Sequence, residues 1–401
     1  MKQHDEAYNK GKMRLISFVA FLMGFAQAVL LYVMSTYFKR ASGIENIGLF
    51  YLVAYAITLI IYLNLHKIIK KIGKSNAFFF SLFFKIIAIV ILMNWSPSYI
   101  TVIVMMFYII MGNLEWLSLD IIIESFSTDT MSGRIRGRYL TILNAGLLLG
   151  PFVSTSLLAK FDFWGVFLAL FIFNSLIFVI SLFGLANVNH KFEANLTSRA
   201  LLKKIFKRKN IMRAYYVSFV LEFFYALMII YTPIYLRDSG LSWEQIGYIF
   251  TVMLIPFVLA QYPMGVLADK KFGEKEFMIF SLITMALSTG VIFFIGTSDV
   301  AVWALVLFLT RIGAALVEVL RDSYFFKRID AHDVDIIDFF RTAQSSAYIL
   351  ASIISAIILI FFSIKVIFLV VAFVVFSALI PAIKLRDNKC EEEILAEKAV
   401  F

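Results

Sequence analysis

The sequence of 401 residues is 61% hydrophobic and only 16% charged, whereas soluble domains contain about half apolar residues. Its formal net charge is +10, and its single cysteine, Cys390, lies near the C-terminus. This composition excludes an ordinary soluble domain and a disulfide framework. The apolar residues instead form runs of roughly 20 to 25 residues, long enough to cross a hydrocarbon layer of about 30 Å as helices.

Twelve apolar runs follow one another along the chain, and we expect each to be a transmembrane helix. Lipid cannot satisfy unpaired backbone amides, so a spanning segment must pair them internally. The length of the runs, and their lack of period-two alternation, argue against a β-barrel. The runs are 15–37, 46–65, 76–94, 99–124, 139–159, 163–186, 214–236, 245–267, 277–296, 299–320, 339–363 and 365–384.

Lysine and arginine are concentrated in every second connection between these runs. If the N-terminus is cytoplasmic, the inner segments hold 30 of the 37 basic residues and the outer segments hold 5. This bias predicts a multi-pass protein of the cell (inner or plasma) membrane with both termini in the cytoplasm. Orientation in the bilayer also accounts for the positive net charge, so we expect no nucleic-acid partner.

The two halves of the sequence repeat each other on either side of the polar stretch 187–213. The Ser-Gly and Ile-Gly pairs within 42–48 recur within 239–247, and Lys-Lys-Ile-Gly at 70–73 recurs as Lys-Lys-Phe-Gly at 270–273. Matched loop positions and a nearly constant offset of 197 to 200 residues make chance similarity a poor explanation. Two parallel six-helix repeats are typical of transporters whose halves rock about a site near the bilayer midplane.

The predicted fold is an all-α membrane protein with twelve transmembrane helices in two pseudo-symmetric six-helix bundles. The predicted parts are a cytoplasmic tail (1–14), an N-terminal bundle (15–186), a cytoplasmic linker (187–213), a C-terminal bundle (214–384) and a second cytoplasmic tail (385–401).

The loop between the eighth and ninth runs reads Gly-Val-Leu-Ala-Asp-Lys-Lys-Phe-Gly-Glu-Lys at 265–275. It resembles the glycine–aspartate–basic loop of the major facilitator superfamily, with one extra residue before the second glycine, and the resemblance covers nearly the whole chain. It implies the fold of that family and a cytoplasmic gate at Asp269, between Gly265 and Gly273. Glycine permits a tight turn, and an aspartate can pair with cations near a helix end.

A second motif lies in the fifth run, where Gly146, Gly150 and Pro151 form Gly-Leu-Leu-Leu-Gly-Pro. Two glycines four residues apart let helices approach closely, and proline kinks a helix. The motif is similar to the glycine–proline motif of proton-coupled drug exporters in the same superfamily, although Ser154-Thr155 stands where that motif ends in a glycine pair. This resemblance favours efflux.

Ionisable residues deep within a span are functional candidates, because they cost several kcal/mol to bury. Glu222 in the seventh run and Arg311 in the tenth lie at depths of about 13–17 Å, near the bilayer midplane. The resemblance implies that both runs line the central cavity, where these two side chains can meet. Either the pair responds to a proton or an anion, or it is a static ion pair that fixes packing. Glu115 is the deepest acid of the fourth run and a further coupling candidate.

Other acids lie near the inner ends of the fourth and tenth runs, and we expect gate salt bridges rather than substrate ligands there. These acids are Asp120, Glu318 and Asp322, with Arg138 and Arg341 as their expected partners.

Hydroxyl-bearing residues line one face of the second and eleventh runs, which flank the cavity in the resembled fold. They line either the substrate cavity or a helix–helix contact, where hydroxyl residues are also common. We include Tyr51, Tyr55 and Tyr348, together with Gln27 of the first run, as cavity candidates. Lys85 ranks lower, because a lysine in a peripheral third helix can extend to the membrane surface.

These features predict a monomeric secondary transporter of a small organic solute that works by alternating access in a lipid bilayer. Intramembrane carboxylates favour proton coupling, and efflux by antiport is slightly favoured over uptake of a polar solute or lipid translocation. A transport-inactive sensor or scaffold is the alternative from another class. We expect no enzyme, cofactor or metal site, since the sequence has no phosphate loop, nucleophile elbow or paired-histidine motif.

Overall fold

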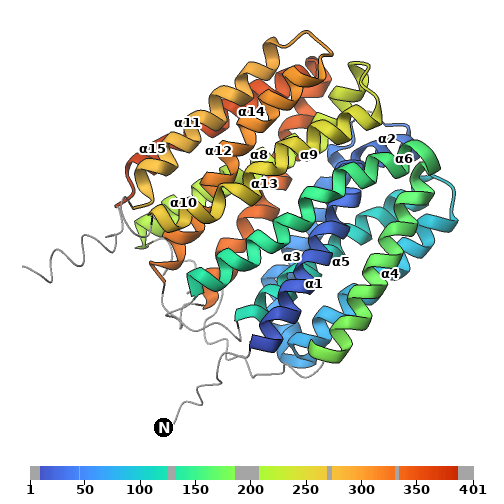
Figure 1. Cartoon of the computed structure of the whole chain (residues 1–401), viewed down its shortest axis with the longest axis horizontal. Coiled ribbons are helices and arrows are strands. Elements are labelled where there is room, and N and C mark those ends of the chain that lie inside the picture. The colour runs from blue at the N-terminus through green and yellow to red at the C-terminus, as the bar shows by residue number, and fades with distance from the viewer. Residues whose placement is uncertain are drawn as a thin grey trace, which may run out of the picture.

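The computed structural model describes residues 10–44, 46–124, 132–185, 207–268, 273–329 and 334–386. Within these ranges all regular structure is helical. The helices form two groups that lie side by side (Figure 1): α1 to α6, blue to green, and α8 to α15, yellow-green to red. The all-helical fold predicted from the apolar runs is confirmed.

The first group contains five helices of ordinary length and one long composite helix. Their bounds are α1 (Lys10–Leu31), α2 (Met34–Ser42), α3 (Gly48–Ile72), α4 (Lys74–Asn94), α5 (Tyr99–Glu124) and α6 (Ser132–Leu185). The helix α6 is two spans that meet at Asp162, whose φ of 55° and ψ of −162° lie outside the helical region. Arg40 Nη1 donates to both carboxylate oxygens of Asp162 at 2.6 Å, which holds this corner in place.

The second group repeats this plan with more interruptions. Its helices are α8 (Lys209–Asp238), α9 (Trp243–Leu259), α10 (Gln261–Leu267), α11 (Lys275–Val291), α12 (Val300–Phe326), α13 (Val334–Phe361), α14 (Lys365–Ser377) and α15 (Leu379–Ile383). Side chains define several starts: Ser242 and Gln245 form a capping box on α9, and Asp299 caps α12.

The number of spans agrees with the prediction. Ten described helical stretches are long and apolar enough to cross a membrane, and Gly48–Asn64 is a shorter apolar helix. One of the ten, Thr141–Leu185, contains both arms of α6, so the described chain accounts for twelve crossings. Three predicted single spans are broken: the first between Leu31 and Met34, the eighth at Ala260 and the twelfth at Ala378.

Helix packing follows the sequence repeat. In the first group α5 packs against α4 and α3, and in the second group α12 packs against the corresponding α11 and α9. Contacts between the groups are also reciprocal, because α3 packs on α13 and α9 packs on α6.

A glycine from the repeated Ile-Gly pair lies at each of these two reciprocal contacts. A Cβ atom on Gly48 of α3 would lie 3.1 Å from Ser355 Oγ of α13, and one on Gly247 of α9 would lie 2.0 Å from Thr155 Oγ1 of α6. Each glycine therefore lets its helix pack closely against a hydroxyl residue of the other group. The sequence repeat thus corresponds to a repeated contact.

The glycine pair of the fifth run lies where α6 packs on α1. A Cβ atom on Gly146 would lie 2.2 Å from the backbone oxygen of Phe21, and one on Gly150 would lie 2.1 Å from Ala28 Cβ. The two helix backbones could not approach this closely with larger residues.

Replacing Gly146 tests this close contact. Gly146→Ala should lower stability by about 1–3 kcal/mol, because the added methyl group meets a backbone atom that cannot rotate away. The matched change Gly290→Ala in α11, whose Cβ would be 3.5 Å from its nearest neighbour, should be neutral or gain up to about 1 kcal/mol of helix propensity. Thermal unfolding of the purified variants measures both; equal melting temperatures would contradict the packing argument.

Candidate functional site: a central cavity and buried charges

A cavity lies between the two helix groups, bounded by residues of α1 to α5, α8 and α13. It is open to solvent, and the space between its walls and the solvent in its mouth together amount to about 560 Å³. Four predicted cavity residues line it: Gln27, Tyr51, Tyr55 and Tyr348. The tyrosines and the amide give it a surface that is aromatic with a few polar groups, as is usual for a small-molecule site.

Tyrosines from both groups meet at this cavity. The rings of Tyr55 on α3 and Tyr348 on α13 stack with centroids 4.0 Å apart and an interplanar angle of 24°. Tyr51, one turn before Tyr55, shares a hydrogen bond of 2.9 Å with Ser35 Oγ of α2. The cavity wall thus depends on how the two groups are placed relative to each other.

Lys85, a weaker cavity candidate from the sequence, also lines the cavity and forms a buried ion pair. Its Nζ donates to Glu115 Oε2 at 2.6 Å and lies 5.3 Å from the ring centroid of Tyr108. Lys85 is 3% exposed and Glu115 is 0% exposed. The peripheral third helix therefore directs its lysine inward, because α4 packs on α5 and an acid on that neighbour neutralises it.

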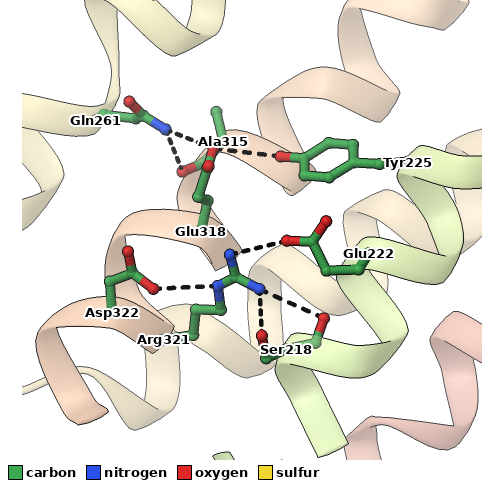
Figure 2. Close-up of polar contacts among 8 residues, drawn as sticks. All are labelled: Ser218, Glu222, Tyr225, Gln261, Ala315, Glu318, Arg321 and Asp322. Atoms are coloured by element: carbon green, nitrogen blue, oxygen red, sulfur yellow. Dashed lines mark hydrogen bonds and ion pairs between the residues drawn. The ribbon is translucent and has the colours of Figure 1, made fainter. Parts of the chain in front are cut away.

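A second set of charges joins α8 to α12 (Figure 2). Arg321 is 5% exposed and donates to Ser218 Oγ at 2.5 Å and to Glu222 Oε1 at 3.2 Å. Its Nε lies 3.3 Å from an oxygen of Asp322. One guanidinium is thus shared by two carboxylates and a serine.

This arrangement corrects the predicted meeting of Glu222 and Arg311. Glu222 pairs with Arg321, which the sequence had assigned to a cytoplasmic connection. The helix α12 continues to Phe326, beyond the predicted end at 320, and carries Arg321 into the bundle. Neutralisation by Glu222 and Asp322 makes this burial possible.

Glu318, predicted to form a gate salt bridge, is instead bound by uncharged groups. Gln261 Nε2 donates to Glu318 Oε2 at 2.9 Å, and the Tyr225 hydroxyl donates to the same oxygen at 3.3 Å (Figure 2). Within the described part of the chain, Glu318 forms no ion pair with a lysine, arginine or histidine. Gln261 Oε1 also accepts a hydrogen bond of 3.0 Å from Asn144 Nδ2 of α6. This polar chain therefore links the two helix groups.

Gln261 and Asn144 were not selected from the sequence. The available signal was Gln261 itself, a polar residue within the apolar run 245–267; the structure places it at the first position of α10, after the break at Ala260. A polar residue at a helix break within the membrane is a useful marker, since the freed backbone groups and the side chain need partners.

Arg311 lies ten residues before Arg321 on α12 and has a different environment. It is 2% exposed, and its guanidinium carbon lies 5.0 Å from the ring centroid of Phe224 and 5.7 Å from that of Tyr225. Among the residues that the structure describes, it makes no hydrogen bond or ion pair, and its Nε and Nη1 atoms are buried without an acceptor.

Only some of the remaining gate candidates lie within the described residues. Asp269 lies outside the described residues, as do the side chains of Asp120 and Arg138. Arg341 is half-buried on α13. Gly273 has a φ of 71°, a left-handed conformation that favours glycine, and Gly265 lies within α10.

The Lys85–Glu115 pair can be tested by a double-mutant cycle. Lys85→Met or Glu115→Leu alone should cost about 3–5 kcal/mol, because each leaves a buried charge unpaired. The double variant should recover most of that loss, since it leaves no charge behind. Unfolding of the purified variants in detergent measures the cycle, and simple additivity of the two losses would show that the pair does not form.

Comparisons with known proteins agree with the architecture. The sequence model of the Major Facilitator Superfamily matches residues 15–334 and 240–399. The structure is similar to that of a bacterial homologue of the iron transporter ferroportin in an outward-facing state (TM-score 0.67, 15% identity, covering 93% of this chain and 99% of that one). It is also similar to the human organic anion transporter TETRAN (TM-score 0.71, 12% identity, covering 92% of this chain and 98% of that one). The search of curated proteins finds no match. The chain belongs to the Major Facilitator Superfamily.

Proposed function

We propose that this protein is a proton-coupled secondary transporter that moves a small organic solute by alternating access. The family and the fold support transmembrane transport of a small molecule. The observation that carries the proton coupling is Glu318, a partly buried carboxylate whose hydrogen-bond partners among the described residues are a glutamine and a tyrosine.

The other coupling candidates are less suited to release and rebind a proton in this state. Glu115 has Lys85 at 2.6 Å, and Glu222 has Arg321 at 3.2 Å. A nearby cation stabilises the charged form of a carboxylate, whereas burial without a cation destabilises it. Of these three acids, Glu318 is therefore the one without a described ion-pair partner, so its protonation leaves no paired cation behind.

Protonation of Glu318 would change hydrogen bonds that link the two helix groups. Its carboxylate oxygen accepts from Gln261, which is bound in turn to Asn144 of the other group. A protonated carboxyl is a weaker acceptor for Gln261, so the bridge between the groups weakens. This gives the proton an influence on the equilibrium between two arrangements of the halves, which is what coupling requires.

Alternating access requires contacts at one end of the bundle to break. At the end away from the start of α1, Lys39 Nζ lies 4.0 Å from Asp238 Oδ2, and Asn46 Nδ2 donates to Ala356 O at 3.3 Å. Both contacts join the two groups. With the termini in the cytoplasm, as the basic residues predict, this is the outer end, and these contacts support an outer end that is closed in this state. The gate at the opposite end is assigned to Asp269 and its neighbours.

Efflux remains the favoured direction because of the Gly146–Pro151 motif. Uptake of a polar solute is the second candidate, which the amide of Gln27 in the cavity wall supports.

Glu318→Gln tests proton coupling. In proteoliposomes loaded with a pH-sensitive dye, a transported compound should move protons with the wild-type protein and not with this variant, because glutamine cannot carry the proton. Exchange of labelled for unlabelled compound should persist, since it needs no net proton movement. Glu244→Gln, at an exposed position in the first turn of α9, is the matched control.

Two results would contradict this assignment. Unchanged proton movement in Glu318→Gln would remove Glu318 from the coupling step. Solute flux in the wild type that ignores an imposed pH gradient would contradict proton coupling altogether.

Closure of the outer end can be tested by cross-linking. In a Cys390→Ser background, the pair Lys39→Cys and Asp238→Cys should be joined by a short bifunctional thiol reagent, because the native side chains lie 4.0 Å apart. Joining them should stop transport, and a cleavable reagent should restore it on reduction. Full transport by the cross-linked protein would show that this end need not open. Either cysteine alone is the control.

A further inference from the structure

We infer that the transported solute is an organic anion and that Arg311 binds its charged group. This inference rests on the proposed transport function and adds the chemical class of the substrate. Three observations support it: the missing partner of Arg311 among the described residues, the aromatic contacts of its guanidinium, and its contact with Tyr225, one helical turn from a residue of the cavity wall.

The other buried cations in the middle of the described bundle are neutralised. Lys85 is paired with Glu115, and Arg321 is shared by Glu222 and Asp322. Arg311 is as deeply buried, yet no described carboxylate lies within ion-pair distance of it, and two of its nitrogens lack an acceptor. A buried charge without a counter-charge is costly, so a binding partner absent from this state would be bound favourably.

The ring contacts explain how Arg311 stays in place without a carboxylate. Phe224 and Tyr225 lie within 5.0 and 5.7 Å of its guanidinium carbon, distances at which a ring attracts a cation. Ring contacts use no hydrogen-bond donor, so the fork of N–H groups stays available. That fork matches the two oxygens of a carboxylate or another oxyanion.

Arg311 does not itself line the cavity, but it lies against a residue close to the wall. Its guanidinium carbon is 5.7 Å from the ring centroid of Tyr225, and Tyr225 is one helical turn before the lining residue Ile229 on α8. Contact between the guanidinium and a bound solute therefore requires a side-chain movement at this part of the wall.

The lining of the cavity also indicates the chemistry of the rest of the solute. Tyr55 and Tyr348 present stacked rings, and the wall is mostly apolar or aromatic. The solute that fits this site has an apolar or aromatic body and one oxyanion group directed at Arg311.

Ligand-dependent thermal shift of the full-length protein in detergent tests the charge preference. The probes are benzoate, methyl benzoate and benzylamine, which share one ring, together with benzenesulfonate and inorganic phosphate. Benzoate or benzenesulfonate should stabilise the wild type, and the ester and the amine should not. Arg311→Met should weaken binding of the anion at least about thirtyfold, the usual effect of removing one partner of a buried charge pair. Arg311→Lys should retain part of the affinity for the anion. A response to phosphate alone would identify a site for inorganic anions and overturn an organic solute.

The melting temperatures without ligand give a second test. Arg311→Met should leave the melting temperature unchanged or raise it, because it removes an unpaired buried charge. Arg321→Met, on the same helix, should lower it, because Glu222 and Asp322 lose their cation. Equal losses in the two variants would show that Arg311 has a structural partner and would overturn the inference, as would the absence of stabilisation by any organic anion.

Transport measurements separate this inference from the proposed function. Flux of a neutral or cationic solute that does not depend on Arg311 would leave the transporter intact and overturn the anion assignment. Binding of anions that depends on Arg311, without flux of any compound in proteoliposomes, would keep the site and overturn transport.

Discussion

Neutralisation of ionised side chains within the helix bundle is the constraint on which the interior of this protein depends. Lipid and packed apolar side chains offer no solvation, so each buried charge needs a counter-charge, strong hydrogen bonds or an aromatic face. Three solutions occur together: an ion pair at Lys85, a shared guanidinium at Arg321, and a carboxylate bound by neutral donors at Glu318. The first two hold helices together. The third leaves a charge that a proton can remove.

The position of Glu318 connects it both to the surroundings of Arg311 and to the other helix group. Its partner Tyr225 donates to it from α8 and also lies against Arg311, while its partner Gln261 reaches Asn144 in the other helix group. The proposed proton site, the proposed anion site and the bridge between the halves therefore share side chains. Groups that share contacts have interdependent energies, so under this proposal occupation of one site changes the affinity of the others.

Movement between the halves also needs surfaces that can separate and close again. The reciprocal contacts of Gly48 with Ser355 and of Gly247 with Thr155 are small and partly polar. Such contacts bring helices close without the interlocking of large side chains, which would need repacking at every cycle. Because the sequence repeat relates the two glycines, the two interfaces are built in the same way.

The sequence by itself determined the class of fold, the twelve spans and their division into two halves. These properties follow from the length of apolar runs, which the bilayer thickness fixes locally, and from repeated words such as Ile-Gly at 47–48 and 246–247. It also identified Glu222, Glu115 and Arg311 as buried ionisable groups.

Only the tertiary structure decided which of these groups meet. Glu222 meets Arg321 and not Arg311, and this choice depends on the rotation of α8 and α12 about their axes. The packing of α4 on α5 brings Lys85 to Glu115, and the break at Ala260 precedes Gln261, which binds Glu318. Depth in the membrane can be counted along a sequence. The azimuth and register of one helix against another depend on packing over the whole interface, which no local pattern contains.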